Sequence, residues 1–184
     1  MNPSPLLPRP TISAFDHWLH ERILRLDTVV VGGSALVLLG VTDRQARDVD
    51  VLVPDLADDV REAARSFAAS VRSQGSELAD EWLNNGPAQP AEILPEGWQS
   101  RVRSIYAGRA LTLRTLGRGD LLKTKLFALC DRGTDLADCI ALAPNAAELS
   151  EARVWLFEQD AHNLWGEHVT STLTNLGTRL GHGI

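Results

Sequence analysis

The sequence predicts an α+β protein, with a small mixed β-sheet, flanking helices and a helical C-terminal half. Two observations favour this fold class. Short β-branched or alternating runs lie between amphipathic segments as far as residue 118, and only helical patterns follow from there to the end. We therefore expect a flexible lead-in over residues 1–10, an α+β core over residues 11–118 and a helical part over residues 119–184 that packs on the core.

The start of the core pairs a helix with a strand. Apolar residues at helical spacing predict a helix over 11–26, with Ser13 as its N-cap. The β-branched run Thr28–Val31 predicts a buried strand, because continuous β-branched residues suit a strand that is covered on both faces. Gly32-Gly33 then predicts a tight turn that leads into a short helix over 34–39.

A second strand and helix follow. The segment Asp48–Val53 alternates in polarity and is closed by Pro54, which indicates a strand. The segment Asp55–Val71 has the spacing of an amphipathic helix, and acidic residues from Asp55 onward stand in its first turn, where the helix dipole favours them.

The remaining elements are a hairpin and four helices. Residues 75–98 are rich in glycine and proline and are expected to be mostly loop. Two short alternating runs on either side of 107–109 predict a β-hairpin over 101–116. Helices are expected over Asp120–Asp131, Asp135–Leu142, Ser150–Asp160 and Leu164–Leu180.

Composition and charge exclude several classes of protein. Hydrophobic residues make up 44% of the 184 residues, and 24 acidic against 18 basic residues give a net charge of −6. This is a globular composition, and its acidity argues against a protein that coats nucleic acid. No apolar stretch approaches the roughly 20 residues of a membrane-spanning helix. Residues 1–10 hold no apolar signal core, and Cys130 and Cys139 are expected to be reduced thiols, so we expect a cytoplasmic protein.

The residues that point to chemistry are Gly32-Gly33-Ser34 and Asp48-Val-Asp50. Side chains two apart on a strand share a face, and two adjacent carboxylates are favourable only with a cation between them. Mg²⁺ prefers such oxygen ligands together with substrate phosphates. A Gly-Gly-Ser turn lets a phosphate approach the backbone. Either motif alone is more often a plain turn or a solvated strand face, but their order and spacing are more specific.

These residues resemble the nucleotidyltransferase superfamily with a DNA polymerase beta-like core. The shared pattern is Val29-Val-Val-Gly-Gly-Ser34 followed by Arg47-Asp-Val-Asp-Val-Leu-Val53. Further likeness lies in Arg44, Trp82-Leu-Asn-Asn-Gly86, Lys125-Leu-Phe-Ala128 and Asp135-Leu-Ala-Asp138. These segments resemble a bacterial branch akin to the nucleotidyltransferase toxins of abortive-infection and toxin–antitoxin systems.

The resemblance implies a nucleotidyltransferase-like fold and a set of site residues. Asp48 and Asp50 would be catalytic and would hold Mg²⁺ or Mn²⁺, with Lys125 and Asp138 completing the catalytic set. Contacts to the nucleotide would come from Gly32, Gly33, Ser34, Arg44 and Lys123. Helical geometry directs Lys125 and Lys123 to different sides, and we expect only Lys125 to face the aspartate pair.

One departure from the pattern leaves two functions open. A third carboxylate is usual on a later strand, and the expected strand Ala110–Leu116 has none. The first reading is a Mg²⁺-dependent enzyme that moves a nucleoside monophosphate from a nucleoside triphosphate to an RNA or protein hydroxyl, in a toxin-like role. The alternative is a catalytically inactive module that binds nucleotide or a partner protein. Five arginines between Arg101 and Arg118 favour an RNA acceptor, and an antitoxin protein is the further expected partner.

Overall fold

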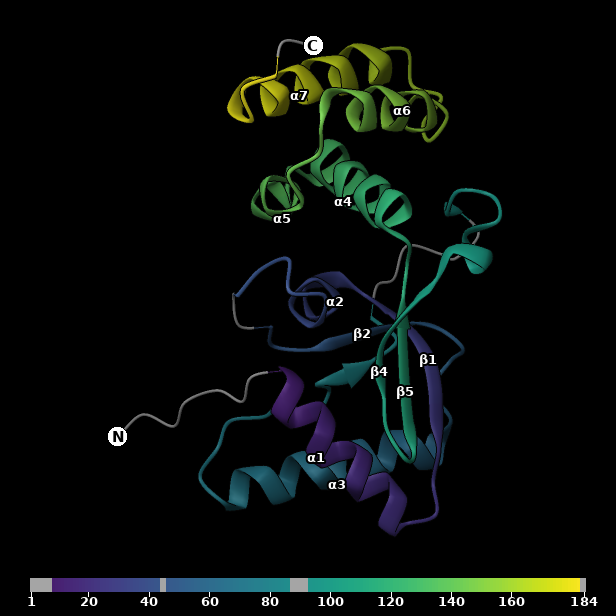
Figure 1. The fold of residues 1–184 in the computed structure, drawn as a ribbon, viewed down its shortest axis with the longest axis vertical. Helices are drawn as coiled ribbons and strands as arrows, with labels where there is room; N and C mark the ends of the chain where they lie inside the picture. The colour runs from purple at the N-terminus through teal and green to yellow at the C-terminus, as the bar shows by residue number, and fades with distance from the viewer. Residues whose placement is uncertain (1–7, 44–45, 87–92, 183–184) are drawn as a thin grey trace. The chain divides into compact units, whose positions relative to one another are not determined.

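The computed structural model describes residues 8–43, 46–86 and 93–182 (Figure 1). It has two compact units, which are described separately. The first comprises Met1–Ala91 and Arg101–Leu116, and the second comprises Glu92–Ser100 and Gly117–Ile184. The helices and strands of the first unit are α1 (Pro8–Glu21), β1 (Leu26–Val31), α2 (Gly32–Leu38), β2 (Val49–Val53), α3 (Asp58–Ser73), β3 (Leu83–Asn84), β4 (Arg103–Ala107) and β5 (Leu111–Thr115).

The five strands form one mixed sheet in the order β3-β2-β1-β5-β4. The central strand β1 runs antiparallel to β2 and parallel to β5, and β3 runs parallel to β2. Strands β4 and β5 form the antiparallel hairpin expected from the sequence. This mixed sheet and its flanking helices confirm the predicted fold class.

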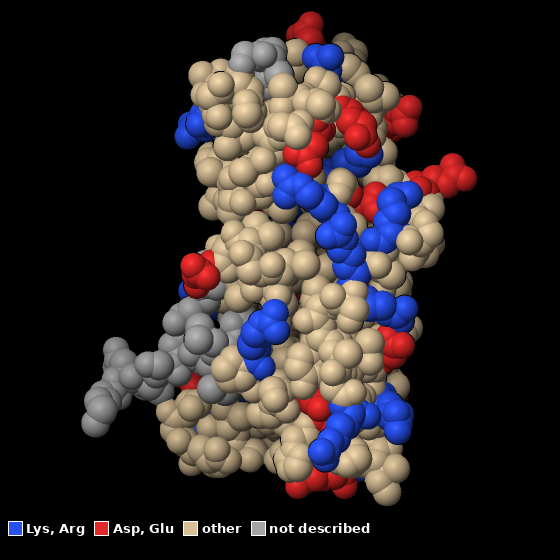
Figure 2. Space-filling view, in the orientation of Figure 1, with Lys and Arg blue, Asp and Glu red and all other residues tan. Residues whose placement is uncertain are grey.

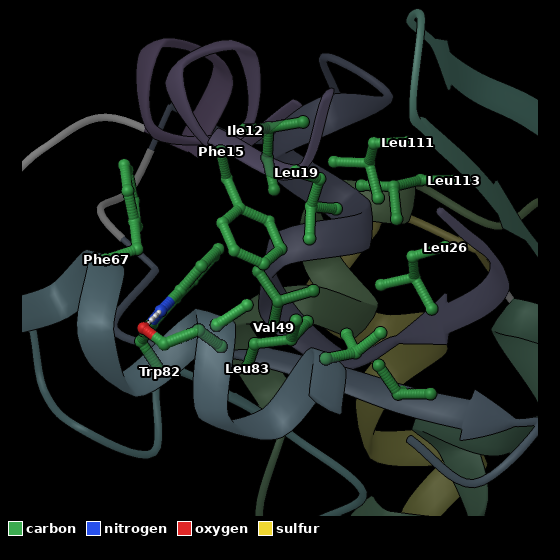
Figure 3. Packing of buried hydrophobic residues seen from close by; sticks show 14 of the residues in the cluster. Ile12, Phe15, Leu19, Leu26, Val49, Phe67, Trp82, Leu83, Leu111 and Leu113 are labelled. Atoms are coloured by element: carbon green, nitrogen blue, oxygen red, sulfur yellow. Dashed lines mark hydrogen bonds between the residues drawn. The ribbon is translucent and has the colours of Figure 1, made fainter. Parts of the chain in front are cut away.

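The core of the first unit lies between the sheet and the helices α1 and α3, which lie side by side (Figure 1). At its centre the rings of Phe15, Phe67 and Trp82 point toward one another (Figure 3). The Phe15 and Trp82 centroids are 5.0 Å apart in an edge-on arrangement. The Trp82 indole nitrogen donates to the Ala64 carbonyl at 3.1 Å, which satisfies its polar atom. Trp82 is therefore a core residue and offers no exposed ring for a base to stack on.

The tip of the hairpin is held by a side chain from α1. The carboxylate of Asp16 accepts hydrogen bonds from the backbone N–H groups of Arg109, Ala110 and Leu111, at 3.1, 2.8 and 2.8 Å. The hairpin turn approaches so closely that a Cβ on Gly108 would collide with this carboxylate. Asp16 thus joins two elements that are far apart in the sequence.

Two predicted helix starts in the first unit are wrong. Helix α1 begins at Pro8, so Ser13 lies inside it and is not its N-cap. Proline is well suited to the first turn of a helix, where its missing N–H costs nothing. Helix α3 begins at Asp58, so Asp55 lies before its first turn. The backbone N–H of Leu56 bonds to the Asn85 side chain at 2.8 Å, which keeps this segment out of the helix.

The second unit is built from helices. The 3₁₀ helix η2 (Trp98–Arg101) begins in this unit, and the α-helices that follow are α4 (Arg118–Arg132), α5 (Leu136–Leu142), α6 (Ala146–Phe157) and α7 (Trp165–Arg179). Helix α6 begins four residues before the predicted start at Ser150, because Asn145 and Glu148 form a reciprocal capping box. Helix α4 packs against α5, α6 and α7, with Phe127 between the rings of Trp155 and Trp165.

Both cysteines are buried free thiols in this unit, as expected. Burial raises the pKa of Cys130 to about 11 and the pKa of Cys139 to about 12. Both side chains are therefore neutral at physiological pH. Within residues 8–43, 46–86 and 93–182, no helix has the length and apolarity needed to cross a bilayer.

Candidate functional site

The carboxylate of Asp50 lies at the turn between β1 and α2. Asp50 is the second residue of β2 and stands opposite Val31, the last residue of β1. The next residue, Gly32, has a φ of +78°, and a Cβ added to it would collide with Asp50 Oδ2. Glycine at this position therefore permits both the turn and the close approach of the carboxylate.

Asp48 lies just before β2, two residues ahead of Asp50. Val49 separates them, and it is buried in the core of the first unit together with Val51. Because side chains alternate along a strand, Asp50 faces away from that core, and the same alternation predicts this direction for Asp48. Asp48 is exposed and Asp50 is half-buried. The structure therefore places Asp50 beside the predicted glycine turn, and the shared face of the two aspartates stays a prediction.

Ser34 fixes the backbone that carries the aspartates. Its side chain is buried, and its hydroxyl donates a hydrogen bond to the backbone carbonyl oxygen of Asp48. The start of α2 is thereby tied to the residue that precedes β2. Ser34, Arg47 and Asp48 also line a small pocket whose apolar wall includes Ile12 and Trp82.

The segment from Asn84 to Gly86 forms the other border of the site. Strand β3 pairs with β2 so that Asn84 stands beside Asp50. A Cβ on Gly86 would lie 2.7 Å from Asp50 Oδ1, so this carboxylate is enclosed by glycine backbone on two sides. Asn85 anchors the segment, because its amide oxygen accepts from Leu56 N at 2.8 Å and its amide nitrogen donates to the Val51 carbonyl at 3.4 Å.

Sequence reasoning used this segment only as a point of resemblance and assigned none of its three polar or glycine residues a role. The available signal was the pair of asparagines followed by glycine after a tryptophan, a pattern typical of a turn next to a core residue. It does not say which strand the turn adjoins.

Strand β5 holds no acidic side chain on the face that carries Asp50. The register of β1 with β5 places Arg114 beside Val29, and Arg114 forms an ion pair with Asp27 on β1. Across β1, Arg114 is in line with Val53 of β2 and not with Asp50. Within the described part of the chain, no group of three histidine, cysteine, aspartate or glutamate side chains is placed to hold a metal ion.

Lys125 of α4 forms a buried ion cluster in the second unit. Its Nζ lies 2.9 Å from Asp138 Oδ2 and 3.0 Å from Asp135 Oδ2. Lys125 and Asp138 are almost completely buried. The structure therefore brings Asp138 of the next helix to Lys125, and the place of Asp138 in the catalytic set stays a prediction. Asp135 is the residue before α5 and adopts a left-handed conformation with a φ of +65°.

Lys123 points to a different neighbour. Its Nζ lies 2.9 Å from the exposed Glu151 Oε1 of α6. The two lysines therefore have separate partners, as helical geometry predicts. It stays a prediction that Lys125 faces the aspartate pair. It also stays a prediction that Lys123 contacts the nucleotide. Arg44, also predicted to bind nucleotide, lies outside the described residues.

The arginines between Arg101 and Arg118 do not act as one group. Arg114 pairs with Asp27, and Arg118 lies 2.8 Å from Glu148. Arg103 and Arg109 are exposed. Figure 2 shows basic and acidic side chains interspersed over the face in view. An RNA acceptor remains a prediction.

A mixed sheet that sets a Gly-Gly turn beside an Asp-x-Asp strand is the arrangement expected for the nucleotidyltransferase superfamily, and comparison with known families confirms this class. The chain belongs to the family described as nucleotidyltransferase of unknown function (DUF6036), whose sequence model matches residues 12–143.

The structure is similar to the crystal structure of an antigenic nucleotidyltransferase-like protein from Paracoccidioides brasiliensis, with a TM-score of 0.49 and 16% identity over 98% of this chain and 96% of that chain. None of the curated proteins that were compared matches the sequence.

Proposed function

We propose that the protein is a Mg²⁺- or Mn²⁺-dependent nucleotidyltransferase that moves a nucleoside monophosphate from a nucleoside triphosphate to a hydroxyl of RNA or protein. The observation that supports this most is the position of Asp50, whose carboxylate lies against Gly32 and Gly86 at the predicted glycine turn. Membership of a nucleotidyltransferase family supports the reaction class.

The donor set fits a hard divalent cation. Carboxylate oxygens are the ligands that Mg²⁺ takes from proteins, and it binds through one or two of them together with substrate phosphates. Asp48 and Asp50 would hold the ion, and glycine at positions 32 and 86 leaves room for the Asp50 carboxylate, with which a Cβ would collide. When bound, such an ion neutralises charge on the triphosphate.

The residues of this chain would then act by holding the carboxylate groups in place for the reaction. In the proposed transfer, the acceptor hydroxyl loses its proton, its oxygen bonds to the α-phosphorus, and pyrophosphate leaves. The hydrogen bond from Ser34 to the Asp48 carbonyl holds the carboxylate-bearing segment at the turn before substrate arrives. Such prior ordering favours catalysis because the protein need not reorganise during the reaction.

The inactive alternative is favoured by one observation, which is that β5 (Leu111–Thr115) carries no acidic residue. Under that alternative the protein binds nucleotide or a partner protein and transfers nothing. The toxin-like role and the antitoxin partner depend on the resemblance described above and are proposed with it.

Transfer of label from α-³²P nucleoside triphosphates to total RNA and to protein tests the proposal. The wild-type chain should label an acceptor with Mg²⁺ or Mn²⁺ and not with EDTA. Asp50→Asn should reduce labelling by more than about 100-fold, since loss of mere supporting residues at metal sites costs 10–100-fold. Asp55→Asn, which changes an exposed carboxylate shortly after β2, is the matched control. Metal-dependent triphosphate binding without labelling of either acceptor would favour the inactive alternative.

A further inference from the structure

The departure at β5 raises the question of which side chain supplies further oxygen to the proposed cation. Strand β3 lies on the other side of β2 from β1, and its pairing places Asn84 directly beside Asp50. Adjacent residues in paired strands project to the same face of the sheet. Asn84 therefore belongs to the face of the sheet that carries Asp50.

The two side-chain oxygens both lie against Gly86. A Cβ built on Gly86 would lie 2.7 Å from Asp50 Oδ1 and 2.9 Å from Asn84 Oδ1, so it would collide with both oxygens. Glycine at this position therefore allows the carboxylate oxygen and the amide oxygen to lie close to the same stretch of backbone.

A hydrogen bond sets the orientation of the Asn84 amide. Its nitrogen Nδ2 donates to the backbone carbonyl of Glu81 at 3.0 Å. A carbonyl oxygen only accepts, so the nitrogen must face Glu81 and the amide oxygen must face Gly86. The oxygen is in this way turned toward Asp50 by the fold of β3 itself.

The neighbouring asparagine is used differently. The amide oxygen of Asn85 already accepts from the backbone N–H of Leu56 at 2.8 Å, and its nitrogen is directed to the carbonyls of Val51 and Pro54. Asn85 therefore stabilises the loop, while the oxygen of Asn84 faces the site.

We propose, on the basis of the proposed function, that Asn84 supplies a neutral oxygen ligand to the divalent cation held by Asp48 and Asp50. Amide oxygens are hard ligands of the kind that Mg²⁺, Mn²⁺ and Ca²⁺ accept. Two acceptor oxygens that lie close to the same stretch of backbone are favourable neighbours when a cation lies between them. Asn84 on β3 would then supply the ligand oxygen that an acidic residue on β5 would otherwise supply.

Direct titration of Mn²⁺, followed by its electron paramagnetic resonance signal, tests this without reference to turnover. Asn84→Ala should weaken Mn²⁺ binding about tenfold, on the scale of lost supporting groups at metal sites. Asn84→Asp keeps the side-chain shape and adds a charge, so it should bind Mn²⁺ at least as tightly as the wild type. Asn163→Ala, which removes an exposed amide in the second unit, should bind as the wild type does.

The outcomes separate this inference from the proposed function. If Asp50→Asn loses Mn²⁺ binding while Asn84→Ala keeps it, the cation site stands and Asn84 is no ligand. If the wild type and Asp50→Asn bind Mn²⁺ equally, or neither binds, the proposed cation site fails and the inference fails with it. Circular dichroism of each variant shows whether it is folded, and Asn84→Asp supplies the test should Asn84→Ala not fold.

Discussion

Asp50 Oδ2 lies so close to the α-carbon of Gly32 that no other residue can stand at position 32 without moving the carboxylate. Gly32 also has a φ of +78°, which L-residues with a side chain rarely adopt. One glycine thus serves two needs, the turn that begins α2 and the space for the aspartate. The two effects can be separated, because the chain offers a second glycine with only one of them.

Gly32→Ala and Gly40→Ala form a matched pair. Gly40 has a φ of +72°, but a Cβ there would meet nothing within 4 Å. Gly40→Ala should therefore cost only the left-handed backbone term, about 1–2 kcal/mol. Gly32→Ala should cost more and should also weaken Mn²⁺ binding, because Asp50 must move. Chemical denaturation and Mn²⁺ titration measure the two effects. If both variants lose the same stability and bind Mn²⁺ equally well, the contact between Gly32 and Asp50 contributes to neither property.

The bonds from the hairpin to Asp16 predict a pH-dependent contribution to stability. Burial by itself raises the pKa of Asp16, but the N–H groups of Ala110, Arg109 and Leu111 outweigh it and hold the pKa below its ordinary value of 3.8. A lowered pKa in the folded state means that the ionised form stabilises the fold. The contribution is complete at pH values well above 3.8 and is lost as the pH falls through the lowered pKa.

Asp16→Asn should therefore lower the free energy of unfolding at pH 7 by about 1.5–3 kcal/mol, the scale of hydrogen bonds to a charged group. The difference from the wild type should shrink as the pH falls from 3.8 through the lowered pKa, because the carboxyl takes up its proton first in the unfolded chain and then in the folded protein. Urea denaturation at pH 7, 4 and 3 measures this. A difference that stays constant over that range would mean that the charge of Asp16 has no part in the effect.

Local patterns in the sequence predict most elements of this fold but not their order in the sheet. The strands β1, β2 and β5 and the helices after Gly117 follow from periodicity, because each carries its own apolar pattern over five or more residues. Strand β3 has only two residues and no pattern of its own, so nothing local indicates it. The parallel pairing of β1 with β5 is a relation between distant segments, and periodicity does not encode it.

The residues of the candidate site also differ in whether a local sequence pattern predicts them. The positions of Asp48 and Asp50 follow from the alternation of side chains along one strand, which a sequence displays directly. The contribution of Asn84 depends on which strand lies next to β2, and the role of Asp16 depends on backbone groups up to 95 residues away. Such contacts arise only when distant segments meet.

Lys125 and Lys123 give the last prediction, which concerns transfer activity and stability together. Lys125 is enclosed with Asp135 and Asp138, whereas Lys123 pairs with a glutamate whose side chain is 73% exposed. The larger guanidinium fork of arginine does not reproduce a buried ammonium, so Lys125→Arg should lose most nucleotide transfer. Lys123→Arg should be nearly silent, since an exposed pair contributes at most about 1 kcal/mol. Equal activity of the two variants would remove the role assigned to Lys125.

A structural role for Lys125 alone would give a different result. Lys125→Ala leaves the buried carboxylate of Asp138 without its cation, and removal of one partner of a buried pair costs about 3–5 kcal/mol. Lys125→Met together with Asp138→Leu removes both charges and should recover much of that stability, because apolar residues of similar volume replace buried pairs well. If Lys125 serves only the fold, Lys125→Arg should keep its transfer activity in proportion to the fraction of folded protein. Loss of transfer by a variant that denaturation shows to be fully folded would instead place the ammonium group in the reaction.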